Sequence, residues 1–311
     1  MRVNDILDKL QEQDNVNLYL VKREKDFNEI TYNLYKTHIN NEIGTEFKDA
    51  LIDVLTDYAK IQDLEYIQYD PCLCSDKNIL EVISCNDIPS FNSIKNQISN
   101  HTDLQTVTCL DEQFIGKIWA YCVHIQNDNS EVIFFRKYSR SKVIKQGKGL
   151  SYFFNEGYLN KLIYDLFTFD SKVDCVYMEE KIIILQKNNF EQIFDFMDKF
   201  KELAFQTFEI IENQGLIHNF EDFTEWCFSD PKKIKKLTDI LNKGYYESIS
   251  FDKVKEMKSE YSLQFDIDED NQKIVCNNGK VVWEILKLYS DDYLTSKLTE
   301  NNYEAHSKSK R

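Results

Sequence analysis

Alternating apolar and polar positions predict β-strands in two parts of the chain. Residues 17–24 and 30–39 alternate in this way near the start. Residues 117–125 and 131–139 form a second pair, and the polar sequence QNDNS separates them. Such alternation places one face of a strand against a core and the other toward solvent, and a short polar link between two strands is typical of a hairpin. We therefore expect antiparallel hairpins.

A third hairpin and two long amphipathic helices complete the main pattern. Residues 173–178 turn through Glu179, Glu180 and Lys181 into the apolar residues 182–185. Apolar residues spaced three and four apart predict helices over residues 43–61 and 189–211, the second beginning just after this hairpin. Shorter helices are expected at residues 90–98, around 158–166, on both sides of Asp230-Pro231, and at 280–288, with a strand pair across residues 267–272.

Mixed strands and helices predict an α+β protein, in which antiparallel hairpins pack against amphipathic helices. We expect an N-terminal α+β region over residues 1–108 and a larger α+β domain over residues 109–311. With 42% hydrophobic residues, 8 Gly and 3 Pro in 311 residues, the chain can bury a substantial core. This composition excludes a disordered or collagen-like chain.

Hydropathy and cysteine usage predict a cytoplasmic protein. The longest apolar run, residues 118–123, has six residues, whereas a membrane-spanning helix needs about 20. The first residues are charged from Asp5 onward and lack the apolar stretch of a secretory signal. The eight cysteines are spread along the chain, so we expect reduced thiols rather than a disulfide framework.

Positive charge is concentrated in one segment of an otherwise acidic chain. The formal charge is -15, yet residues 136–149 contain no acid. The cations of this segment are Arg136, Lys137, Arg140, Lys142, Lys145 and Lys148. Because screening limits charge effects to about 8 Å at physiological salt, a local basic strip can contact phosphates in an acidic protein. These residues are the first candidates for DNA contacts, and the alternative is a solvated face.

A second basic segment follows Pro231, which is expected to open a helix. Its candidate DNA contacts are Lys232, Lys233, Lys235 and Lys236. The helix expected over residues 220–228 precedes it, so the pair resembles a helix-turn-helix whose second helix is basic. Here too, the alternative is a solvated helix face.

No sequence motif assigns a catalytic, cofactor or metal site. Cys72 and Cys74 form a lone CxC motif, for which two packed thiols are the favoured interpretation. Asp165 or Asp174, followed by Glu179, Glu180 and Lys181, loosely fits the carboxylate and lysine pattern of a Mg²⁺-dependent nuclease. The competing interpretation makes residues 179–181 the solvated tip of a hairpin. A nuclease using Asp174, Glu179 and Lys181 therefore stays an alternative.

Three stretches resemble the KwaB family, the component of the Kiwa anti-phage defence system that lacks membrane spans. They are FTFDSKVDCVYMEEKIIILQKNNFEQIFDFMDKF, the strand VIFFRKYS with its basic continuation, and LYSDDYLTSKLTENNYEAHSK. The resemblance covers about residues 117–308. It implies a cytoplasmic protein that assembles with a KwaA-like multi-pass membrane partner and is held at the membrane through that partner. It also implies a DNA-binding effector that limits phage replication without a hydrolytic site.

The resulting expectation is sequence-independent DNA binding within a membrane-associated complex. The net charge of -15 requires a small binding face or one completed by a homo-oligomer. A Mg²⁺-dependent nuclease and a scaffold that binds only the membrane partner are the alternatives.

Several positions recur in the family resemblance. They are Phe169, Asp170, Asp174, Leu294, Ser296, Leu298, Thr299 and Tyr303. The first interpretation is structural, with Asp170 accepting backbone N–H groups at a turn and Ser296 and Thr299 closing the C-terminal strand. The functional alternative is that Ser296, Thr299 and Tyr303 line a DNA or partner surface.

Overall fold

The computed structural model describes residues 1–10, 15–26, 29–73, 76–100, 104–107, 112–127, 130–139, 143–144, 152–155, 157–161 and 166–305. The chain forms two compact units. Unit 1 contains residues 1–68 and 77–194, and unit 2 contains residues 69–76 and 195–311. The short segment 69–76 therefore leaves unit 1 between two of its strands and belongs to unit 2.

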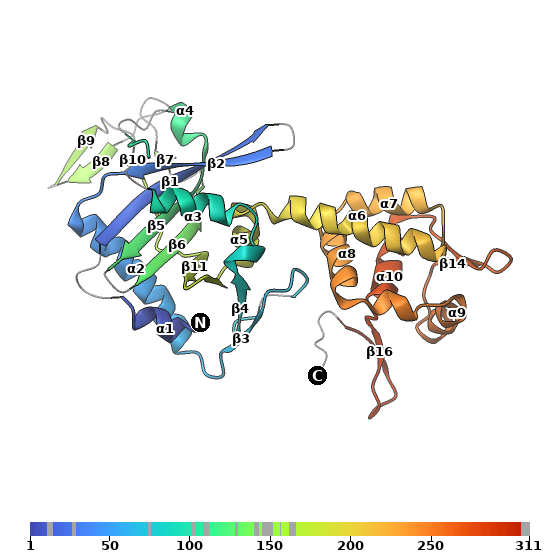
Figure 1. Cartoon of the computed structure of the whole chain (residues 1–311). Helices are drawn as coiled ribbons and strands as arrows, with labels where there is room; N and C mark the ends of the chain where they lie inside the picture. The colour runs from blue at the N-terminus through green and yellow to red at the C-terminus, as the bar shows by residue number, and fades with distance from the viewer. Residues whose placement is uncertain are drawn as a thin grey trace. The chain divides into compact units, whose positions relative to one another are not determined.

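Unit 1 is built on an eight-stranded sheet with the order β2-β1-β5-β6-β11-β12-β4-β3 (Figure 1). Its strands are β1 (Asn15–Asp26), β2 (Glu29–Thr37), β3 (Glu65–Gln68), β4 (Ile79–Ser84), β5 (Ile118–Gln126), β6 (Glu131–Lys137), β11 (Cys175–Met178) and β12 (Lys181–Ile184). All neighbouring strands are antiparallel except β3 and β4, which are parallel. The expected α+β class and the three hairpins are confirmed.

Helices α1 (Val3–Leu7) and α2 (Asn41–Ala59) cover one face of this sheet. Leu51 and Leu55 of α2 are fully buried in one cluster with Leu18 and Val123 of the sheet. Helix α2 begins cleanly because the Asn40 side chain accepts a hydrogen bond from the backbone N–H of Ile43. The apolar stripe predicted from sequence therefore faces the sheet.

Helices α3 (Phe91–Ser99) and α5 (Lys187–Ile193) cover the opposite face with aromatic side chains. The rings of Phe91, Phe135 and Phe194 meet edge to face, with centroids 5.2 to 6.1 Å apart. Edge-to-face pairs place the positive ring edge against a negative ring face. The sheet is thus the middle layer of three.

Unit 1 also contains smaller elements, and strands occur where a helix was predicted around residues 158–166. The smaller elements are η1 (Cys85–Asp87), α4 (Glu112–Ile115), β7 (Val143–Ile144), β8 (Tyr152–Asn155), β9 (Tyr158–Lys161) and β10 (Leu166–Phe167). The helix predicted around residues 158–166 is wrong, because β9 pairs with β8 and β10 pairs with β7. Gly157, between β8 and β9, has φ +85°, a conformation that glycine favours and that ends any local helix.

Unit 2 is mainly helical. Its helices are α6 (Phe196–Gln214), α7 (Phe220–Phe228), α8 (Pro231–Lys243), η4 (Tyr245–Ser248), α9 (Phe251–Glu260) and α10 (Gly279–Tyr289). A small sheet pairs β15 (Lys273–Val275) with β13 (Ile217–His218) and β14 (Asp266–Asp268), and β16 (Tyr293–Thr295) forms a hairpin with β17 (Asn302–Glu304). Buried Phe200, Phe208, Leu237 and Ile285 lie in its core.

The long helix predicted over residues 189–211 is interrupted in the structure. Helix α5 ends at Ile193, α6 begins at Phe196, and Asp195 between them has φ +52°. Asp tolerates this left-handed conformation better than most residues. The apolar residues before the break are buried in unit 1, and those after it are buried in unit 2. A single periodic pattern in the sequence therefore contributes to two separate cores.

The compact units do not follow the expected division after residue 108. Strand β1 pairs with β5 from Asn15↔Gln126 to Lys22↔Ile118, and β12 pairs with β4. These pairings join segments on both sides of residue 108 into one sheet. The change between units along the chain falls instead at residues 194 and 195.

Candidate functional site

Arg136, the first candidate DNA contact, lies near the end of β6 and pairs with two carboxylates. Its Nε and Nη2 atoms donate to both oxygens of Asp170 at 2.9 and 2.8 Å, and Nη1 donates to Asp174 at 2.6 Å. The hydrogen bonds with Asp170 raise the pKa of Arg136 above its ordinary value. The side chain is 13% exposed, so its charge is directed into the protein.

Asp174 fixes the end of β6 from inside unit 1. Its side chain is fully buried and accepts hydrogen bonds from the Arg136 guanidinium, the backbone N–H of Lys137 at 2.6 Å and Asn189 Nδ2 at 2.9 Å. A buried carboxylate needs such partners because removing it from water is costly. Asp170 also accepts the backbone N–H of Lys172 at 3.3 Å, as the turn interpretation expects.

Lys137 is engaged with an aromatic ring. Its Nζ lies 3.3 Å from the centre of the Trp119 ring and donates to the Trp119 carbonyl at 2.9 Å. The Arg23 guanidinium also lies over this ring, at 4.5 Å. The remaining cations of the first segment, Arg140, Lys142, Lys145 and Lys148, lie outside the described residues.

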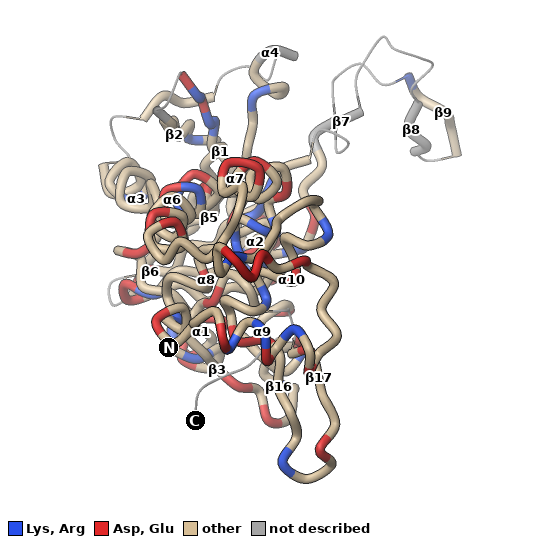
Figure 2. The backbone as a smooth tube through the Cα atoms, turned by 90° about the vertical axis from the view of Figure 1, so that its right-hand side faces the viewer, with Lys and Arg blue, Asp and Glu red and all other residues tan. Residues whose placement is uncertain are grey.

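The lysines of α8 do not form one exposed face. Lys232 is exposed, whereas Lys233 is buried and donates to the Trp226 carbonyl at 3.1 Å. Lys235 lies over the Phe200 ring at 5.5 Å, and Lys236 pairs with Asp292 at 2.6 Å. The preceding helix α7 carries three acids and no cation, as the red segments of Figure 2 show.

The residues of the nuclease alternative do not converge. Asp174 lies before β11, and Glu179 lies beyond the other end of this strand. Four strand residues span about 13 Å, too far for two ligands of one metal ion. Glu179 and Lys181 are exposed at the hairpin turn, while Asp174 is fully buried against Arg136. The described geometry therefore favours the hairpin-tip interpretation.

One cluster in the described part of the chain could supply ligands to a metal ion. It consists of Asp70, Cys72 and Asp239 of unit 2, whose potential ligand atoms lie within 4.8 Å of one another. Lys243 Nζ lies 2.6 Å from Asp239 and 3.9 Å from Asp70, so an ammonium neutralises the carboxylates. Burial raises the pKa of Cys72 to about 12, and its thiol donates to the Lys235 carbonyl at 3.2 Å. A metal needs the thiolate, so this geometry favours an ion-paired cluster.

The C-terminal family positions lie on the β16–β17 hairpin. The hydroxyl of Ser296 accepts the backbone N–H groups of Leu298 and Thr299, both at 3.2 Å, and so closes the turn. This confirms the structural interpretation of Ser296. Leu298 is 92% exposed and Tyr303 is 51% exposed, so both side chains can reach a partner.

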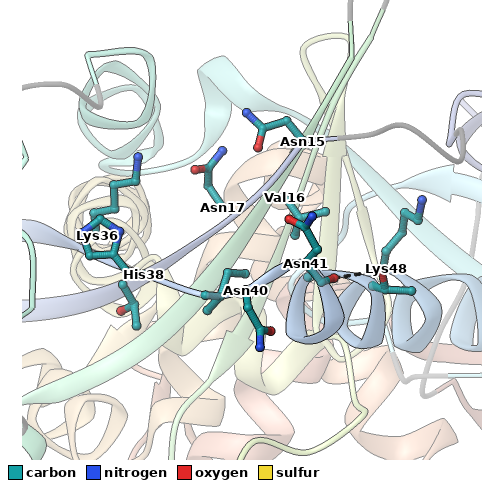
Figure 3. Close-up of a pocket in the computed structure, with 12 residues that line it drawn as sticks. Asn15, Val16, Asn17, Lys36, His38, Asn40, Asn41 and Lys48 are labelled. Atoms are coloured by element: carbon teal, nitrogen blue, oxygen red, sulfur yellow. Dashed lines mark hydrogen bonds between the residues drawn. The ribbon is translucent and has the colours of Figure 1, made fainter.

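Sequence reasoning missed a polar cavity of about 420 Å³ in unit 1 (Figure 3). It is lined by Asn15, Val16, Asn17, Lys36, Thr37, His38, Ile39, Asn40, Asn41, Gly44, Thr45 and Lys48. These residues come from the start of β1, the end of β2 and the first turns of α2. The asparagines that flank these elements are a visible sequence signal, but their convergence depends on the strand pairing.

The fold defines an α+β protein with a strongly basic segment at the end of a central strand. A family model described as Kiwa protein KwaB-like matches residues 115–299, more than half of the chain. The chain therefore belongs to the KwaB-like family and to Kiwa anti-phage defence, which confirms the resemblance seen in the sequence. No curated protein and no solved structure matches it. Within the described residues, no helix is long and apolar enough to cross a bilayer.

Proposed function

We propose that this KwaB-like protein is the sequence-independent DNA-binding effector of a Kiwa complex and acts beside a KwaA-like multi-pass membrane partner. The observation that carries the proposal is the basic segment 136–149, which has six cations and no acid in a chain of charge -15. Cations without intervening acids suit a phosphate backbone and carry no preference for particular bases.

The geometry suggests different roles for the cations within this segment. Arg136 and Lys137 are held by Asp174, Asp170 and Trp119, so they anchor the segment where it leaves β6. We assign the main phosphate contacts to Arg140, Lys142, Lys145 and Lys148. Lys232, exposed on α8, is a secondary contact.

Acidic surfaces elsewhere would repel DNA and restrict binding to one orientation. A contact made by four cations predicts a slope of log K against log salt concentration of about -4, because each neutralised phosphate contributes about -0.9. A homo-oligomer would multiply the number of contacts and make the slope steeper. A salt titration of DNA binding measures both the affinity and this slope.

The test is DNA binding by the purified full chain over a salt series, with Mg²⁺ in parallel samples. Changing Arg140, Lys142, Lys145 and Lys148 to Glu should abolish binding without altering thermal unfolding. A matched control changes four exposed lysines elsewhere, Lys60, Lys77, Lys181 and Lys297, to Glu and should retain most of the affinity.

Equal losses in the two variants would show that net charge rather than the segment controls binding. Absence of binding in the unmodified protein would favour a scaffold that contacts only the membrane partner. Cleavage that disappears in Glu179→Ala would instead support the nuclease.

A further inference from the structure

The cavity at the start of α2 has rigid walls. Strand β2 reaches it at Lys36, whose backbone N–H donates to Gln105 at 3.0 Å and whose carbonyl accepts from Val107 at 2.8 Å. On the opposite wall, Gly44 allows α2 to approach β1, since a Cβ at this position would lie 3.3 Å from Val16 Cβ. The backbone on both sides is thus fixed by contacts within unit 1.

The lining is polar and has no negative side chain. It contains four asparagines, two threonines, Lys36, Lys48 and His38. In a chain with 53 acids and 38 Lys and Arg residues, a cavity with two lysines and no acid differs sharply from the average surface. Figure 3 shows Lys36 and Lys48 on opposite sides, with Asn15, Asn17 and Asn41 between them.

A buried polar atom on the lining also supports a bound ligand. The Thr37 hydroxyl is buried and forms no hydrogen bond within the described structure. A buried hydroxyl is stabilised by a hydrogen-bonding partner, and a phosphate oxygen can accept that bond while its negative charge suits a lining with lysines and no acid.

We propose that this cavity binds a small phosphate-bearing ligand. Lys36 and Lys48 would contact phosphate oxygens from two sides, and the asparagine amides would hydrogen-bond the rest of the molecule. A volume of about 420 Å³ lies within the range of small-molecule sites. The opening turn of α2 adds the positive end of a helix, but the two ammonium groups provide most of the positive charge.

This site uses residues other than the proposed DNA contacts. The cavity is lined by residues 15–48, whereas the proposed DNA contacts are four cations of residues 140–148 and Lys232. The small-ligand proposal therefore does not rest on DNA binding, and each can fail without the other. A protein carrying both sites could respond to a phosphorylated metabolite as well as to DNA.

The experiment is isothermal titration of the full chain with inorganic pyrophosphate, followed by adenosine diphosphate. Lys36→Ala should weaken binding about tenfold or more, which corresponds to about 1.4 kcal/mol. Lys60→Ala removes an exposed ammonium at the other end of α2 and should leave the affinity unchanged.

A second variant separates binding from folding. Asn41→Asp places a carboxylate in the cavity at the first residue of α2, where an acid favours the helix. It should therefore weaken phosphate binding while the melting temperature stays the same or rises. Loss of binding in a variant with an intact melting transition cannot be attributed to unfolding.

Two results would overturn the proposal. One is no binding of either probe up to about 5 mM, the weak end of specific affinity. The other is an unchanged affinity in both Lys36→Ala and Asn41→Asp. If Lys36→Ala weakens only duplex DNA binding and neither probe binds, the cavity contacts a DNA phosphate, and the small-ligand proposal is wrong.

Discussion

Glu131 is a partly buried carboxylate surrounded by cationic and imidazole groups. His124 Nε2 lies 2.9 Å from its Oε1 atom, and Lys95 pairs with Oε2. The close contact with His124, followed by the hydrogen bond with Lys95, lowers the pKa of Glu131 from 4.5 to about 2. The charged form is therefore favoured in the folded state.

This shift predicts a loss of stability in acid. A carboxyl with a lowered folded pKa stabilises the protein above its unfolded pKa near 4.5, and this contribution is lost as the pH falls toward about 2. The shift corresponds to about 3 kcal/mol, which partial exposure reduces to about 2. Glu131→Gln should remove this part of the pH dependence, as measured by urea unfolding at several pH values.

Glu46→Gln is the matched control, because Glu46 is exposed on α2. It should keep the full acid dependence of the unmodified protein. Parallel curves of unfolding free energy against pH for the unmodified protein and Glu131→Gln would contradict the role assigned to the cluster.

Individual charges were the least predictable feature from sequence. The local charge pattern predicted that Arg136 is a cation of a basic strip and available for a phosphate contact. Its carboxylate partners, Asp170 and Asp174, lie 34 and 38 positions away, and strand pairing brings them together. The same holds for Lys236 and Asp292 in unit 2. A local charge pattern does not contain this information, because ion pairs between strands and helices depend on tertiary packing.

At the scale of elements, the turn between β11 and β12 is unusual in composition. Glu179 and Glu180 have φ values of +50° and +62°, and Met178 pairs with Lys181 across them. A two-residue hairpin turn with both residues in the left-handed region favours Asn-Gly, because Gly has no Cβ to clash. The Glu-Glu sequence is therefore strained.

Replacing this turn should stabilise the protein. Glu179→Asn combined with Glu180→Gly is expected to add about 1 kcal/mol and to raise the melting temperature by about 2 to 4 °C. Differential scanning calorimetry measures the change. The control, Glu179→Ala with Glu180→Ala, removes the same charges but keeps both Cβ atoms. An equal rise in both variants would attribute the gain to charge rather than to backbone strain.

Periodicity predicted most strands and helices, and its failures have local causes. The hairpins containing β5 and β11 and the helices α2, α3 and α10 match the expected ranges within a few residues. The break at Asp195 was missed because the apolar spacing continues through it. The error at residues 158–166 arose because short apolar runs fit both a strand and a helix. The apolar pattern predicted whether most segments are strands or helices. It did not predict that the chain passes from the core of unit 1 to the core of unit 2 after residue 194.

At the scale of the whole molecule, the family match covers only part of the folded sheet. Residues 115–299 include β5, β6, β11 and β12 but omit β1 to β4, α1 and α2. Without these elements, β5 loses its partner β1, and β12 loses its partner β4. The apolar face covered by α2 would also be open to water.

A fragment of residues 109–311 is therefore not expected to form the native sheet. It should show little near-ultraviolet circular dichroism from unit 1 and should aggregate at concentrations where the full chain does not, because open strand edges and apolar faces associate. The full chain with the same purification tag is the control. A fragment with native-like aromatic signals and a cooperative melting transition would show that the sheet does not need β1 to β4.

The segment 69–76 has a consequence for the order of events during synthesis. Cys72 contacts Lys235, which follows it by 163 residues, and Asp70 pairs with Lys243. At about 5 to 20 residues per second, a ribosome needs roughly 10 to 30 seconds to make this intervening chain. Throughout that interval Cys72 lacks the α8 residues that contact it, so the nascent chain exposes this thiol to oxidants and electrophiles more than the finished protein does, where it is partly buried.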